Sequence, residues 1–187
     1  ALPIFLLAAA QRGYAPAQSL LASRYNTGTD GVAKDIKKAA SWAEVAAKNG
    51  DAEGQYLYGL LLTNQESGLQ SNAMLSFEML SKAAAQGHPR ASLLLATQTD
   101  LLPPSNERAE LKKKHLLVAS SAGIQSAQLA LLDMLITADK SGVAVPPEAR
   151  KSIDLLAVQD RSMHTLARGL LARLDKDYDT AATLLTS

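Results

Sequence analysis

The chain has 187 residues, no cysteine, and 19 basic against 18 acidic side chains, for a formal charge of +1. This balance excludes binding to nucleic acid or to an anionic membrane through bulk charge, and the lack of cysteine excludes disulfides, thiolate metal sites and cysteine nucleophiles. Hydrophobic residues make up 47% of the chain but aromatic residues only 4%, so the core must consist mainly of alanine and leucine, which favour helices.

The first segment, residues 1–13, reads ALPIFLLAAAQRG and is strongly apolar. It is much shorter than the roughly 20 residues needed to cross a bilayer, and the basic leader of a signal peptide is absent. No other stretch of the sequence is long and apolar enough, so we expect no integral membrane segment. We expect residues 1–13 to form the second helix of a truncated preceding repeat.

Glycines recur along the chain at intervals of 37, 37 and 36 residues, each closing an alanine-rich run: Gly13, Gly50, Gly87 and Gly123. One further step reaches Asp160. A second series lies between them, at Gly31, Gly68 and Gly142, with Ser105 at the step that lacks glycine. Two turn signals per period, separated by apolar residues at helical spacing, indicate two helices per repeat. The predicted repeats are 14–50, 51–87, 88–123 and 124–160, followed by a C-terminal tetratricopeptide-like hairpin at 161–187.

The first complete unit resembles the Sel1-like repeat, a relative of the tetratricopeptide repeat. The matching positions are Ala17, Gln18, Leu21, Ala22, Tyr25, Gly28, Gly31, Val32, Asp35, Lys38, Ala39, Trp42, Ala46, Ala47 and Gly50. The second unit keeps Gln55, Tyr58, Gly59, Gly68, Ala83, Ala84 and Gly87, and later units are more degenerate. The resemblance implies an all-α fold, a right-handed α-α superhelix (solenoid) of about five helix hairpins forming a single domain.

Motifs for catalysis or cofactor binding are absent from the sequence, which has no phosphate-binding loop, no GxSxG and no HExxH. The histidines His88, His115 and His164 belong to three different repeats, so we interpret them as loop or surface residues without a metal. The basic run Lys112–Lys114 is short and has no interleaved aromatic residues, which argues against nucleic acid. We therefore expect no cofactor and no enzymatic activity.

The resemblance implies that the first helix of each hairpin lines a concave surface. Counting from each repeat-closing position places a stripe of mostly apolar residues on that surface, with polar residues at its edge; the predicted partner-binding residues are Ser19, Tyr56, Leu60, Asn64, Arg90, Leu93, Thr97, Leu129, Asp133 and Leu166. Exposed apolar stripes usually mark interaction sites, with Tyr56 as the expected anchor. Two alternatives stay open: a tight superhelix buries the stripe as ordinary core, or the stripe packs against parts of the same protein outside this sequence.

These features favour a non-enzymatic module that binds a protein partner, as a bacterial adaptor or as an inhibitor or immunity protein that neutralises a secreted toxin (effector). The preferred compartment is the bacterial periplasm or cell envelope. Two alternatives stay open. One is a Sel1-like enzyme that binds or hydrolyses β-lactams, although the family members with that association pair cysteines that this chain lacks. The other is a structural scaffold segment of an envelope assembly protein.

Overall fold

The computed structural model describes residues 4–99 and 103–139, and beyond these a few single positions: Lys151, Asp154, Thr165, Arg168, Gly169, Ala172, Thr180 and Thr183. The described part is all-α, with no strand among its residues. Its helices are α1 (Ile4–Gln11), α2 (Ala15–Thr27), α3 (Ile36–Lys48), α4 (Ala52–Leu61), the short 3-10 helix η1 (Gln65–Ser67), α5 (Ala73–Ala85), α6 (Pro89–Gln98), α7 (Asn106–Ser121) and α8 (Gln125–Asp139). The predicted all-α helical repeat fold is confirmed.

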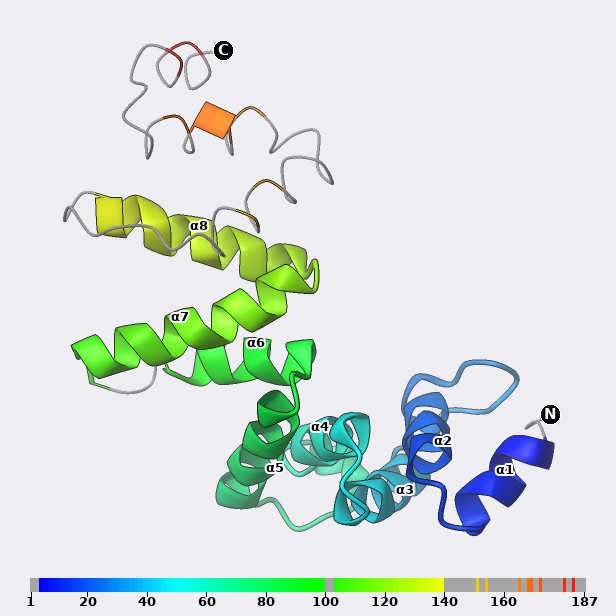
Figure 1. Cartoon of the computed structure of the whole chain (residues 1–187). Coiled ribbons are helices and arrows are strands. Elements are labelled where there is room, and N and C mark those ends of the chain that lie inside the picture. The colour runs from blue at the N-terminus through cyan, green and yellow to red at the C-terminus, as the bar shows by residue number, and fades with distance from the viewer. Residues whose placement is uncertain are drawn as a thin grey trace. The chain divides into compact units, whose positions relative to one another are not determined.

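The chain forms two compact units, Ala1–Leu95 and Ala96–Ser187, and α6 begins in the first and ends in the second. In the first unit each helix from α1 to α4 packs against the next one, and α2 also contacts α4 (Figure 1). In the second unit α7 packs against α8. The predicted C-terminal hairpin at 161–187 and the loop after α8 lie outside the continuously described residues.

The turn that closes each alanine-rich run has the same geometry four times. Gly13, Gly50, Gly87 and Gly123 all have φ between 80° and 89°, in the left-handed region that glycine adopts at low cost. After each glycine, the next backbone N–H donates to an alanine carbonyl five residues earlier, as in Asp51 to Ala46 and His88 to Ala83. This is the Schellman arrangement, so the 37-residue glycine spacing sets where the second helices end.

Polar side chains define where several helices begin. Asp35 accepts a hydrogen bond from the Lys38 backbone N–H at the start of α3, and Asp51 does the same for Gly54 at the start of α4. Asn72 and Ser105 cap α5 and α7 in the same way. Each cap satisfies a backbone donor that has no partner inside its own helix.

Buried alanines let the helices of the first unit approach closely. Ala39, Ala43 and Ala46 on α3 are fully buried. A Cβ added at Gly54 on α4 would lie 2.4 Å from the Ala46 Cβ and 2.9 Å from backbone atoms of α3. Neither helix has room for one more methyl group at this crossing, because backbone atoms form part of the contact.

A buried amide in the first helix of a repeat ties successive helices together. The Gln18 side chain donates to the Ala10 carbonyl of α1 at 3.0 Å and accepts from the Asn49 side chain, just after α3, at 2.8 Å. One repeat later, Gln55 accepts from Gln86, just after α5, also at 2.8 Å. The Gln86 side chain reaches the Gly50 carbonyl as well. The bonds to the Ala10 and Gly50 carbonyls join a hairpin to the one before it, and the two amide–amide bonds join the helices within one hairpin.

We expect Gly54→Ala to lower the free energy of unfolding by about 1–3 kcal/mol, because the new methyl group forces α3 and α4 apart. This sign is opposite to the usual gain when alanine replaces glycine inside a helix. The measurement is chemical denaturation followed by circular dichroism. Lys48→Ala, at an exposed position on α3, is the control and should change stability by less than about 0.5 kcal/mol. A Gly54→Ala protein as stable as the parent would contradict the close crossing.

Candidate functional site

The predicted partner-binding residues of the first unit do not all reach the surface. Tyr56 and Leu60 on α4 and Leu93 on α6 are partly exposed, and Arg90, in the first turn of α6, is exposed. Ser19 is only 4% exposed, and its hydroxyl donates to the Pro16 carbonyl of its own helix. The expectation that Ser19 faces a partner is therefore wrong, because a side chain this small is covered by its neighbours.

Tyr56 lies at the junction between two hydrophobic clusters. Its ring packs against the cluster around Ala43, Leu57 and Leu61 and against the cluster around Leu80 and Leu95. Burial raises the pKa of its phenol, while the Arg90 charge and hydrogen bond oppose this and the Glu53 charge adds to it. Tyr56 is therefore partly a core residue, and truncating it would remove packing as well as surface.

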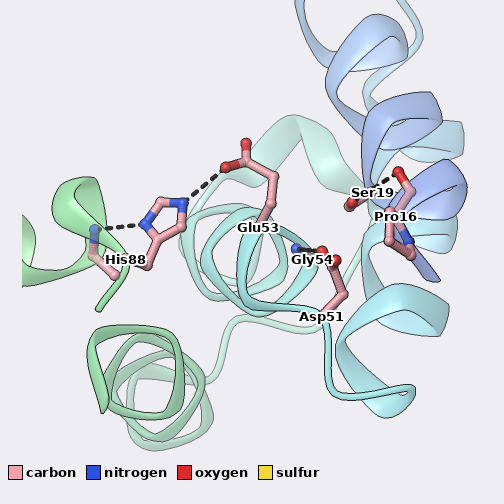
Figure 2. A network of polar contacts seen from close by, with 7 residues as sticks. Pro16, Ser19, Asp51, Glu53, Gly54 and His88 are labelled. Carbon is pink, nitrogen blue, oxygen red and sulfur yellow. Dashed lines mark hydrogen bonds and ion pairs between the residues drawn. The ribbon is translucent and has the colours of Figure 1, made fainter. Parts of the chain in front are cut away.

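His88 is held on both ring nitrogens and against the Tyr56 ring. Its Nδ1 accepts the Ala91 backbone N–H at 3.1 Å, and its Nε2 lies 2.7 Å from the Glu53 carboxylate (Figure 2). The two rings stack with centroids 4.6 Å apart and planes 22° from parallel. Because Nδ1 acts as an acceptor, the proton must sit on Nε2, which donates to Glu53. The neutral imidazole thus caps α6 and ties it to α4.

His88 lies in the loop between α5 and α6, as the interpretation of it as a loop or surface residue allowed, but its side chain is only 11% exposed and is bonded on both nitrogens. The repeat register carries a signal for its role: His88 occupies the position of Asp51 one repeat earlier, and Asp51 caps α4. A histidine in that position can cap a helix only through an unprotonated nitrogen. Glu53 was not singled out, because no local pattern in the sequence links it to a residue in the next repeat.

Asn64 uses its side chain within the loop that follows α4. Its Oδ1 accepts the Glu66 backbone N–H at 2.8 Å, which starts η1. Its carbonyl accepts the Ser67 hydroxyl. The Asn64 side-chain oxygen is therefore already bonded within the loop, and the residue, predicted to meet a partner, is partly exposed.

In the second unit the predicted residues lie on α8 and at the end of α6. Leu129 is 37% exposed, and Asp133 follows it by one helical turn and is also exposed, so the two share one face of α8. Thr97, in the last turn of α6, is exposed as well. Leu166 lies outside the described residues.

Within the described part of the chain, no group of three or more His, Asp or Glu side chains is placed to hold a metal ion. His115, on α7, has a pKa lowered by burial and by the neighbouring Lys114, and His164 lies outside the described residues. None of the described helices is long and apolar enough to cross a membrane.

The geometry defines a class: an all-α helical repeat protein in which the first helices α4 and α6 present a partly exposed, mixed apolar and basic face. Comparisons with known proteins name the family. The Sel1 repeat family matches residues 15–51 and 52–88. Residues 15–88 thus match two consecutive Sel1 repeats, and this part of the chain is similar to Sel1 repeat proteins. Sel1 repeats form a protein-interaction fold.

Among curated proteins, chitin synthase regulatory factor 3 of Schizosaccharomyces pombe is 31% identical over 107 residues, which cover 57% of this chain but only 11% of that protein. Among solved structures, a Sel1 repeat protein from Oxalobacter formigenes matches 91% of this chain and 48% of its own, with TM-score 0.68 and 25% identity. The Escherichia coli protein c5321, described as a protective antigen with an SLR fold, matches 96% of this chain and 40% of its own, with TM-score 0.68 and 22% identity. The chain therefore spans half or less of the length of these relatives.

The cap on α6 predicts how two substitutions at His88 differ. Both variants lose the stacking on Tyr56 and the bond to Glu53, but His88→Asn should be about 0.5–2 kcal/mol more stable than His88→Ala, because an asparagine oxygen can accept the same backbone N–H. Chemical denaturation measures both. In the parent protein at neutral pH, a long-range ¹H–¹⁵N NMR spectrum should show Nδ1 as the unprotonated nitrogen. The opposite tautomer, or equal losses in the two variants, would contradict the geometry of this cap.

Proposed function

We propose that this chain is a non-enzymatic module that binds a protein partner through the face of α4 and α6. This surface, called here the α4–α6 face, consists of Tyr56, Leu60, Arg90 and Leu93. The observation that supports the proposal most directly is that Tyr56, Leu60 and Leu93 are partly exposed. If the stripe were ordinary core, these side chains would be fully buried, whereas a binding surface leaves them accessible to a partner.

The match to the Sel1 repeat family also supports a role in protein interaction, since its second repeat contains Tyr56 and Leu60 of this face. The relative from fission yeast is named as a regulatory factor of chitin synthase, and a factor that regulates an enzyme can act by binding rather than by catalysis. By analogy, the chain would act on another protein.

The proposed setting is a bacterial cell, in the periplasm or cell envelope. There the module would serve as an adaptor, or as an inhibitor or immunity protein that neutralises a secreted toxin. The similarity in fold to proteins from Oxalobacter formigenes and Escherichia coli is consistent with a bacterial source. The near-zero net charge suits a specific folded partner better than a general polyanion.

The test uses photo-crosslinking from the α4–α6 face, identification of the crosslinked protein, and titration of that protein in purified form. The double variant Leu60→Ala, Leu93→Ala should weaken binding at least about tenfold, because both side chains would be covered by the partner. Met74→Ala is the matched control: Met74 is 86% exposed and apolar but lies on α5, so its loss should leave affinity unchanged.

Circular dichroism must show that all variants keep the helical content of the parent. Equal binding by the parent and the double variant would reject the α4–α6 face. Sustained turnover of a β-lactam reporter by the purified chain would instead favour the enzymatic alternative.

A further inference from the structure

Arg90 occupies a position that helix stability does not explain. It lies in the first turn of α6, directly after Pro89, where the positive end of the helix dipole disfavours a cation. In the described part of the chain no carboxylate lies within ion-pair distance of it, and nearby Glu53 is already paired with His88. Among the described residues, no carboxylate therefore neutralises the charge of Arg90.

The surroundings of Arg90 combine this charge with apolar surface. Its guanidinium group forms a hydrogen bond with the Tyr56 phenol on α4. Leu93 lies one turn further along α6, and Leu60 lies one turn beyond Tyr56 on α4; both are partly exposed. An incoming side chain would thus meet one cation beside apolar groups.

This arrangement matches one kind of ligand chemistry. A polyanion such as nucleic acid needs several cations along its backbone, whereas the α4–α6 face has one arginine. A single carboxylate can accept paired hydrogen bonds from a guanidinium group and would offset the unfavourable charge at the helix start. The adjoining leucines would take an apolar side chain next to that carboxylate.

We propose that the partner binds the α4–α6 face with a segment that places an aspartate or glutamate on Arg90 and an adjacent apolar side chain against Leu60 and Leu93. This inference rests on the proposed function and specifies the chemistry of the partner. It assigns Arg90 the role of selecting acidic segments, and it assigns the leucines the role of holding them.

The experiment selects binders to the whole chain from a displayed library of random 12-residue peptides and measures affinities by fluorescence anisotropy. Selected peptides should contain Asp or Glu next to an apolar residue. Replacing that acid by its amide, or replacing Arg90→Ala, should each weaken binding about tenfold, and both together should weaken it little further, as expected for two groups that pair. Lys34→Ala, which removes an exposed cation from the loop before α3, is the control and should change nothing.

A charge exchange gives a second readout that does not depend on loss of binding. Arg90→Glu should bind a peptide in which lysine replaces the acid better than the parent protein does. Both effects should shrink at high salt, because the pair is near the surface. Failure of the selection, selected peptides without an acid, or independent effects of Arg90→Ala and the amide change would each overturn the inference.

Two results separate this inference from the proposed function. If the double variant Leu60→Ala, Leu93→Ala loses binding of a partner protein but Arg90→Glu does not, the α4–α6 face binds protein and the predicted contact between a carboxylate and Arg90 is wrong. If the chain sediments as a dimer that Arg90→Glu dissociates, the occupant is a second copy, and the inference fails.

Discussion

The buried amide near the start of the first helix is the interaction on which the stack depends. In two successive repeats, Gln18 and Gln55 accept a hydrogen bond from an amide just after their own second helix, at Asn49 and Gln86. A buried amide without a hydrogen-bond partner is costly, so these bonds favour the packing of the helices in which both amides are paired. The third repeat has Ser92 at this position, whose buried hydroxyl has no hydrogen-bond partner. The later repeats therefore lack the full set of bonds that orders residues 15–88.

Because this amide and the alanine contacts bind each first helix to its neighbours on one side, the remaining side is left for other uses. On α4 that side carries Tyr56 and Leu60. Tyr56 spans two hydrophobic clusters and stacks on His88, so it serves the fold and the face together. If this face binds a partner, the packing of Tyr56 into the core would limit the entropic cost of association. Because Tyr56 also belongs to the core, substitutions of the leucines and Arg90 are the more specific tests of binding.

The periodic features were predictable because they follow from local rules. Gly50 and Gly87 end their helices in the left-handed conformation that the spacing indicated. The exposure of individual side chains was not predictable to the same degree. Ser19 and Tyr56 occupy equivalent positions one repeat apart, yet Ser19 is buried and Tyr56 is partly exposed. The position in the repeat predicts on which face of the helix a residue lies. The size of its side chain and the packing of the neighbouring helix decide how much of that side chain is exposed to solvent.

The sequence by itself determined the all-α repeat, the turns that close the second helices and the resemblance to Sel1 repeats, because turn glycines, caps and small core residues act over a few residues and recur with the period. Only the tertiary structure decided that Glu53 contacts His88, that Nδ1 of this histidine accepts a backbone hydrogen bond, and that Arg90 has no acidic partner among the described residues. Those facts depend on side chains from different repeats that lie tens of residues apart in sequence. The conformational preferences of neighbouring residues do not determine these contacts, because they depend on how one repeat packs against the next.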